Sequence, residues 1–234
     1  GTHTLGPMSV DFDSPLLDAA RRRVLIGDGA MGTMLQAVDL DVDEDFLGLE
    51  GCNEILNATR PDVVEGIHRA FFEAGADLVE TNTFGCNLSN LGDYDIVDRI
   101  GELAEKGAAI ARRVADEMGP SEDGTPRMVL GSLGPGTKLP SLGQTTFEDI
   151  RNAYSKAAEG LARGGADAYL IETSQDLLQV KAAITASRRA MADLGRSIPI
   201  ISHVTVETTG TMLLGSEIGA ALAAIEPLGV DMIG

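Results

Sequence analysis

The stretch Gly164-Gly165-Ala166-Asp167, followed directly by Ala168-Tyr169-Leu170-Ile171-Glu172-Thr173, decides the fold class of this chain. Glycines that end a helix lead through an aspartate into a short apolar run, which is typical of a turn before a buried strand. The same pattern recurs at residues 74–81, again with Glu-Thr at its end, and part of it recurs at 229–233. This recurrence of helix end, turn and strand indicates a β/α repeat.

Short apolar runs bounded by Gly or Pro extend the pattern along the chain and predict six parallel strands, buried on both faces. These strands are Val24–Gly27, Asp77–Thr83, Met128–Ser132, Ala168–Thr173, Pro199–Val206 and Val230–Ile233. Segments with helical periodicity separate them. The predicted helices are Pro61–Ala74, Ile96–Met118, Phe147–Arg163 with Gly164 as its end, one that begins at Leu177, and one capped by Ser216 that ends near Pro227.

The strand spacing leaves two architectures open. Strands recur about every 41 residues, so a chain of 234 residues holds six strand–helix units. An eight-stranded barrel needs two further units, whereas a doubly wound sheet of six strands needs none. In both architectures, function lies beyond the carboxyl ends of the strands.

Composition narrows the class of protein. The net charge of −18 argues against nucleic acid or an anionic membrane surface as the main partner, and no run of apolar residues is long enough to span a bilayer. Two cysteines make no disulfide framework, so we expect a reduced, cytoplasmic protein. Residues 1–7 are expected to be an artificial extension before a natural start at Met8, with one domain over residues 8–234.

Three carboxylates follow successive predicted strands, namely Asp28, Glu80 and Glu172. Because parallel strands end at one edge of the sheet, we expect these groups to converge there, where they can bind an ammonium group or an ordered water, or transfer a proton. The alternative is that each carboxylate caps a nearby helix or accepts loop N–H groups. Carboxylates in a cluster disfavour a phosphate ligand, since like charges repel.

Other motifs are weak. Gly27, Gly29 and Gly32 match a dinucleotide-binding spacing, but the acidic segment 37–45 replaces the expected helix and second strand. The two cysteines and two histidines lack metal-ligand spacing. We expect His68 to lie on a partly exposed helix surface, and His203 to be a hydrogen-bonded core residue.

Five strings occur in order along the chain: Gly27-Asp28-Gly29-Ala30-Met31-Gly32-Thr33, Cys52-Asn53-Glu54 with Pro61-Asp62, Glu80-Thr81-Asn82-Thr83-Phe84, Gly131-Ser132-Leu133-Gly134-Pro135 and Leu170-Ile171-Glu172-Thr173. Together they resemble one family, the homocysteine S-methyltransferases, and within it the homocysteine-binding domains of cobalamin-dependent methionine synthases. The resemblance runs from about Val24 to Gly234. Betaine- and S-methylmethionine-dependent homocysteine methyltransferases share this domain and remain alternatives, as does a zinc-free amino-acid-binding module.

The resemblance implies an α/β fold, a (β/α)₈ TIM-type barrel of which this chain carries about six of the eight strand–helix units. It also implies a methyltransferase of methionine biosynthesis that binds homocysteine at the barrel mouth. The implied substrate-binding residues are Asp28, Gly29, Ala30, Met31, Glu80, Thr81, Ser132 and Glu172. We expect Glu172 and Asp28 to hold the ammonium group, and the N–H groups of residues 29–31, with Ser132, to receive the carboxylate.

The family's cofactors are expected outside this chain. In the family, zinc on three cysteine thiolates activates the homocysteine thiol for attack on methylcobalamin, whose methyl group comes from methyltetrahydrofolate. The first zinc cysteine follows the sixth strand, where this chain stops at Gly234, and neither Cys52 nor Cys86 matches a zinc ligand. We therefore expect a domain truncated at its C-terminal side, without metal or cofactor and catalytically incomplete alone, whose partners are folate- and cobalamin-binding domains of the full-length chain.

Overall fold

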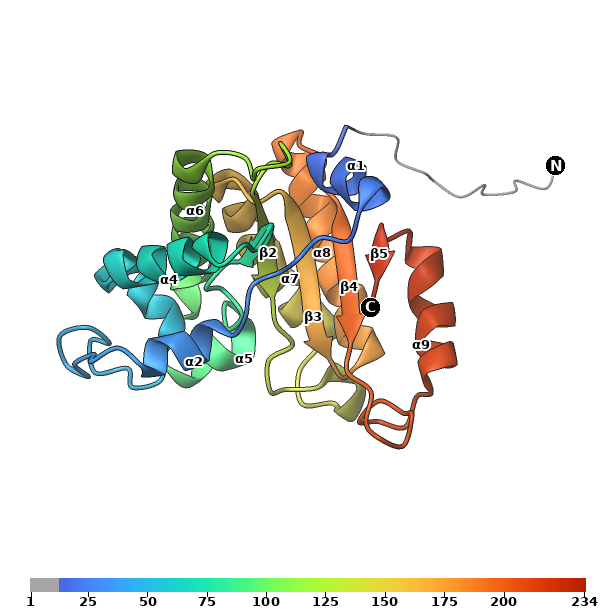
Figure 1. The fold of residues 1–234 in the computed structure, drawn as a ribbon. Helices are drawn as coiled ribbons and strands as arrows, with labels where there is room; N and C mark the ends of the chain where they lie inside the picture. The colour runs from blue at the N-terminus through green and yellow to red at the C-terminus, as the bar shows by residue number, and fades with distance from the viewer. Residues whose placement is uncertain (1–12) are drawn as a thin grey trace.

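Five parallel strands form one sheet in the order of the sequence in the computed structural model, which describes residues 13–234 (Figure 1). The strands are β1 (Leu78–Glu80), β2 (Met128–Leu133), β3 (Ala168–Ser174), β4 (Ile200–Val204) and β5 (Met232–Ile233). The predicted extension at residues 1–7 and the start at Met8 lie outside the described residues. The first predicted strand is reduced to a single bridge between Gly27 and Leu78.

The strand order decides between the two architectures that the spacing left open. A doubly wound sheet reverses its strand order part way along, whereas a barrel adds each strand beside the previous one. Every pair here joins consecutive strands, from Gly27 beside β1 through to β5. All six predicted strand positions therefore take their places in the order of a (β/α) barrel.

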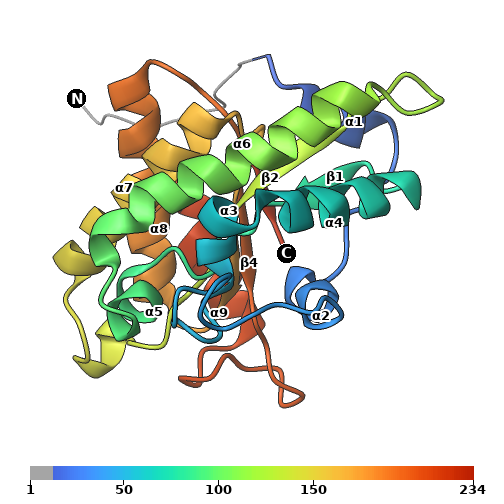
Figure 2. The ribbon, with the colours of Figure 1, turned by 90° about the vertical axis from the view of Figure 1, so that its left-hand side faces the viewer.

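Helices cover the outer face of this sheet (Figures 1 and 2). The helices of the chain are α1 (Pro15–Arg22), α2 (Met31–Gln36), α3 (Leu56–Thr59), α4 (Pro61–Glu73), α5 (Leu88–Asp93), α6 (Ile100–Met118), α7 (Phe147–Gly164), α8 (Leu177–Leu194) and α9 (Ile218–Ile225). Figure 2 shows α4 and α6 side by side in front of β1 and β2. On the inner face, α1 packs against the first residues of the strands and closes that end of the core.

The predicted helices are all present, and only their end residues differ from the prediction. The helix predicted from Ile96 begins with a 3₁₀ turn at Val97–Arg99. α7 ends at Gly164, one residue later than predicted, and is followed by Gly165, whose φ of +98° suits glycine. The prediction of Ser216 as a helix cap is wrong. Glu217, not Ser216, directly precedes α9, and it makes no side-chain cap. Ser216 belongs to the preceding turn, where its carbonyl accepts the Met212 N–H.

The aspartates of the sequence repeat join three strands, β1, β3 and β5, to the segment before each of them in the sheet. The Asp77 carboxylate accepts the Ile26 N–H at 2.9 Å, while the Asp77 N–H donates to the Ile26 carbonyl. Asp167 makes the same two bonds to Val129, and Asp231 makes them to Ile200. This reciprocal pair fixes the offset between neighbouring strands at their first residues, so the repeat visible in the sequence is a device that sets strand register.

Glycines bring α6 and α7 unusually close. A side chain at Gly160 would collide with the backbone of Gly101 and Glu105, and one at Gly164 would collide with Glu105 and Ala108. At these two glycines the backbones of the two helices therefore come into close contact.

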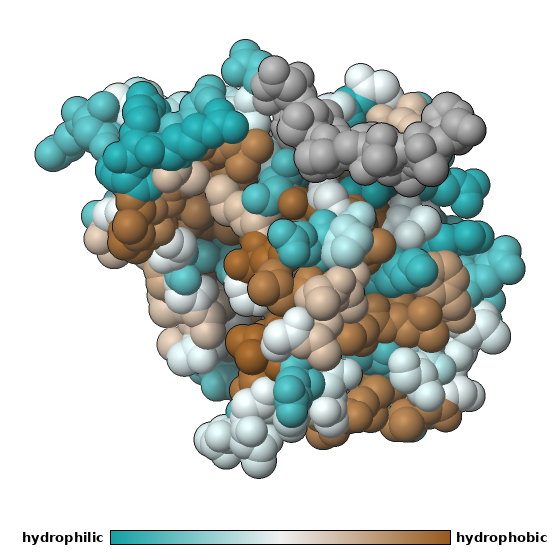
Figure 3. Space-filling model, turned by 90° about the vertical axis from the view of Figure 1, so that its right-hand side faces the viewer, coloured by the Kyte–Doolittle hydropathy of each residue, from teal (hydrophilic) through white to brown (hydrophobic). Residues whose placement is uncertain are grey.

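Apolar side chains remain exposed on the side of the molecule that carries α9 and β5 (Figure 3). Ile218 and Leu222 on α9 and Ile233 on β5 are examples. Within residues 13–234, no helix combines the length and apolar character needed to cross a bilayer.

Asp77→Ala should lower the free energy of unfolding by about 1–3 kcal/mol, because it removes the acceptor of the part-buried Ile26 N–H and of two guanidinium N–H groups of Arg23. Asp123 binds the same guanidinium at 2.7 Å, but its side chain is 49% exposed. Asp123→Ala should therefore cost less than about 1 kcal/mol. Urea titration of both variants checks this, and equal losses would contradict the role assigned to Asp77.

Gly160→Ala should destabilise the fold by about 1–3 kcal/mol, because the added methyl group meets the α6 backbone. The matched control is Gly66→Ala in α4, where nothing lies within 4 Å of the new methyl group. That change should be neutral or stabilising by up to about 1 kcal/mol, since alanine favours helix. Thermal unfolding of the pair measures the difference, and a Gly160→Ala variant as stable as wild type would rule out the close contact.

Candidate functional site

Side chains on the inner face of the sheet form two layers. Leu78, Leu130, Leu170 and Ile201 pack together with α1 in the apolar layer. Because side chains alternate along a strand, the residues two positions further on face the same way. Those residues are Glu80, Ser132, Glu172 and His203. An apolar layer is therefore followed, at the carboxyl edge of the strands, by a layer of polar and ionisable groups.

The predicted carboxylates converge at this edge. Ser132 Oγ donates to Glu172 Oε1 at 2.5 Å, and the Glu80 N–H donates to both oxygens of the Asp28 carboxylate at 3.1 Å. The Glu80 carboxyl lies close enough to Glu172 and Asp28 for their charges to raise its pKa. Four of the eight predicted site residues thus form one connected cluster drawn from four neighbouring segments of the sheet.

Burial makes the cluster hold protons. Removal from water raises the pKa of Asp28 to about 7, against the lowering effect of the Glu80 N–H. Burial also raises the pKa of Glu80 well above its ordinary range, and the neighbouring Glu172 and Asp28 carboxylates raise it further. Because Glu80 and Asp28 both have raised pKa values, the ligand-free site carries less than three negative charges at neutral pH.

A β-bulge aims Glu172 into the site. Ile171 pairs with Ser202 and Ser174 pairs with Val204, so Glu172 and Thr173 together lie opposite His203. Thr173 has a φ of +57°, in the left-handed region that a β-branched residue rarely adopts. Bulges of this kind redirect side chains next to active sites, and such strain persists only where the surrounding structure enforces it.

Thr81 supports the site from behind. The Ser132 N–H donates to Thr81 Oγ1 at 3.0 Å, and the Thr83 hydroxyl donates to the Ser132 carbonyl at 2.7 Å. The 2.6 Å contact between the two threonine hydroxyls must then use the Thr81 proton. This closed ring is buried and fixes Ser132 relative to β1, so the Thr81 hydroxyl is occupied by structural bonds.

Residues 29–31 line the opposite side of the edge. Gly29 and Ala30 are exposed and Met31 is half-buried. Ala30 precedes α2 without a side-chain cap, which leaves the first N–H groups of that turn without a side-chain acceptor. A side chain at Gly29 would come within 3.0 Å of the Phe71 ring, so this backbone lies close against α4.

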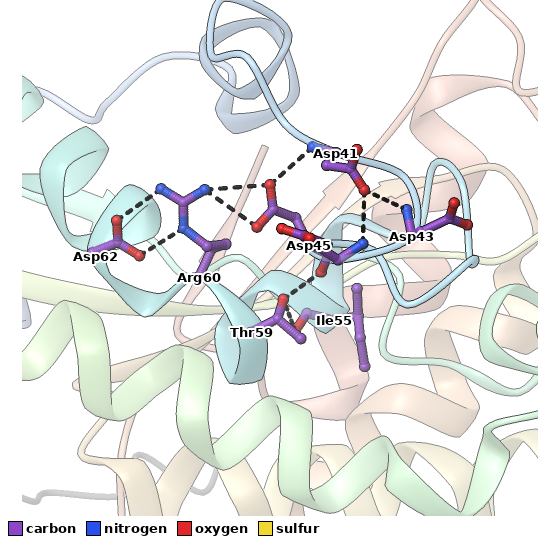
Figure 4. Close-up of polar contacts among 8 residues, drawn as sticks. Asp41, Asp43, Asp45, Ile55, Thr59, Arg60 and Asp62 are labelled. Carbon is purple, nitrogen blue, oxygen red and sulfur yellow. Dashed lines mark hydrogen bonds and ion pairs between the residues drawn. The ribbon is translucent and has the colours of Figure 1, made fainter.

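The acidic segment after α2 forms a loop that is held by its own hydrogen bonds and by an ion pair with Arg60 (Figure 4). The Asp41 carboxylate accepts the N–H groups of Asp43 and Glu44, and Asp45 accepts the Asp41 N–H. Asp45 also pairs with Arg60, whose guanidinium binds Asp62 on its other side. Between α2 and β1 the described residues hold no strand.

The cysteines do not form a metal site in the described part of the chain. Cys52 and Cys86 are free and buried. Burial raises the pKa of the Cys52 thiol to about 11, and it also raises the pKa of the Cys86 thiol well above its ordinary value. Across residues 13–234, no group of three or more His, Cys, Asp or Glu side chains has an arrangement that could hold a metal ion.

Both histidine predictions are wrong. His68 is fully buried on α4, with no hydrogen bond to either ring nitrogen, and burial lowers its pKa to about 4. The prediction failed because α2, α3, α6 and β1 all contact α4, so its buried stripe is wider than one helical face. His203 is exposed in the polar layer and not in the core. The alternation from Ile201 is the sequence signal that could have placed it there.

Comparison with known proteins adds three findings. The family model described as homocysteine S-methyltransferase matches residues 25–234. Curated methionine synthases of Mycobacterium tuberculosis and Mycobacterium leprae are 70% and 67% identical over 223 residues, which is 95% of this chain. The metallated form of the homocysteine methyltransferase MmuM from Escherichia coli superposes with a TM-score of 0.75 at 17% identity, over 94% of this chain and 77% of that one.

These matches differ in what they establish. The MmuM likeness, at low identity, supports the fold alone. The chain spans 18% of the length of the two mycobacterial relatives, so it corresponds to one part of those proteins. The family match covers nearly the whole chain, and the structure places the family's strand-end strings on one edge of one sheet. The chain belongs to the homocysteine S-methyltransferase family.

Proposed function

We propose that this chain binds homocysteine at the carboxyl edge of its sheet and is the homocysteine-binding part of a methionine synthase. The observation that carries the proposal is the carboxylate cluster of Asp28, Glu80 and Glu172, which offers an α-ammonium group several charged acceptors. Charge-assisted hydrogen bonds of this kind are the strong ones. The identity to two methionine synthases favours this activity over betaine- or S-methylmethionine-dependent methyl transfer.

The cluster gives the amino acid a defined orientation. Glu172, aimed by the bulge and held by Ser132, is the principal acceptor of the ammonium group, with Asp28 and Glu80 beside it. The substrate carboxylate lies toward the N–H groups of residues 29–31. Since the Ser132 hydroxyl hydrogen is engaged by Glu172, Ser132 contributes to carboxylate binding only if it releases that bond.

Ammonium binding displaces a proton. The proton held by Glu80 or by Asp28 has no place once a cation sits between these groups. It leaves to solvent, and the fully ionised carboxylates then face the ammonium group. The site therefore exchanges one cation for another, which limits the charge repulsion in both states.

The full reaction needs groups from elsewhere in the protein. The described residues do not fit the family's zinc, since the two buried thiols have raised pKa values and no metal-binding group of three is present among residues 13–234. No step of our proposal therefore uses zinc held by these residues. Methyl transfer from methylcobalamin, the folate-binding domain and a cytoplasmic location belong to the proposal for the whole enzyme.

Glu172→Gln should weaken homocysteine binding by about tenfold or more, because a charge-assisted bond contributes roughly 1.5–3 kcal/mol. The amide keeps an oxygen that can accept from Ser132, so the change removes charge and preserves shape. Glu207→Gln, on the exposed loop after β4, is the matched control and should leave the affinity unchanged. Isothermal titration calorimetry on the intact protein measures both, and unchanged affinity in Glu172→Gln would remove Glu172 from the ammonium role.

Affinity should rise by about tenfold between pH 6 and pH 8, because Asp28 and Glu80 have raised pKa values and hold at pH 6 the proton that the ammonium group must displace. Norvaline, which replaces the thiol with a methyl group, serves as ligand so that thiol ionisation makes no contribution. Titrations in two buffers of different ionisation enthalpy should count close to one proton released at pH 6. Proton uptake, or affinity independent of pH, would contradict the exchange.

A further inference from the structure

We propose that His203 is a further substrate-binding residue, whose imidazole faces the side-chain end of the bound amino acid and hydrogen-bonds its sulfur. The inference rests on the proposed function. It adds a residue that selects a thiol-bearing amino acid, on the side of the site away from residues 29–31.

His203 belongs to the polar layer by strand geometry. It lies two residues after Ile201, whose side chain packs in the inner apolar layer, so both side chains face inward. The flanking residue Val204 packs on the outer, helix-covered side, which agrees with this alternation. His203 therefore projects from the same edge and the same face as Glu172.

The His203 imidazole packs beside Gly234 but makes no hydrogen bond within the described residues. A side chain at Gly234 would come within 2.7 Å of His203 Cδ2 and 2.9 Å of Nε2, so the ring lies beside Gly234, the residue after β5. Among residues 13–234, no side chain makes a hydrogen bond to the His203 ring, which is exposed. Both ring nitrogens are thus available to a ligand.

The order of groups along the edge gives His203 its role. From one side to the other, the chain presents Asp28 with residues 29–31, then Glu80, Ser132, Glu172 and His203. An amino acid with its ammonium group at the carboxylates and its carboxylate at residues 29–31 directs its side chain toward β4. Neighbouring strands lie about 4.8 Å apart, which two methylene groups and a sulfur can span from Glu172.

The bulge strengthens this placement. Glu172 and Thr173 lie opposite the single residue His203, so the acceptor of the ammonium group and the imidazole stand at the same height on adjacent strands. The rest of the inward polar layer consists of carboxyl groups and one engaged hydroxyl. Carboxylates repel a thiolate, whereas an imidazole can accept from S–H or donate N–H to sulfur.

The test compares homocysteine with norvaline, its isostere without the thiol, on the intact protein. His203→Leu and His203→Ala should weaken homocysteine binding about three- to tenfold, the value of one net hydrogen bond. Norvaline should bind both variants within about twofold of wild type. The ratio of the two dissociation constants, measured by calorimetry, is therefore the readout that responds to the sulfur contact.

The outcomes separate this inference from the function on which it rests. If wild type binds both ligands but the ratio stays constant in the two variants, His203 does not contact the sulfur and the inference fails alone. If both ligands weaken equally, His203 acts only by shaping the site, which also overturns the inference. If wild type binds neither ligand, the proposed function itself fails. Glu207→Gln, which should change neither affinity, controls for unrelated effects of substitution near β4.

Discussion

The structure depends on the reciprocal bonds by which Asp77, Asp167 and Asp231 join β1, β3 and β5 to the segment before each of them in the sheet. Side chains alternate along a strand, so a slip of one residue would send Glu80, Ser132 or Glu172 to the helix-covered face and bring apolar side chains into the site. Fixing the offset at the first residue of each strand therefore determines which groups meet at the last. The apolar layer above α1 then acts as the floor on which the polar layer is built.

Two features that raise the free energy of the folded state lie together at the site. Desolvated carboxyl groups crowd together, and a β-branched residue takes a left-handed conformation to aim one of them. The buried hydroxyl ring of Thr81 and Thr83 and the close packing of α6 on α7 supply the rigidity that holds this arrangement. A ligand cation relieves the repulsion, which is the thermodynamic basis for specific binding of an ammonium group here.

Local sequence signals predicted the strands, the long helices and the convergence of three carboxylates, because buried parallel strands and amphipathic helices have strong periodicities. They failed where tertiary surroundings decide. Gly27 forms only a bridge, since its strand has one neighbour among the described residues. The burial of His68 depends on how many elements surround α4, and the exposure of His203 depends on what covers the inner face of β4. The sequence held no signal for the bulge at Glu172, because threonine, the residue in the left-handed conformation there, rarely adopts that conformation.

The consecutive strand order also bears on how the chain is made. Each strand–helix unit finds its principal partner in the unit just before it, so pairing can proceed in the direction of synthesis as the polypeptide leaves the ribosome. α1 is the exception. The residues of the inner face that α1 packs against include Ile201, which is synthesised nearly two hundred residues later. α1 therefore completes its contacts only once the fourth strand is in place.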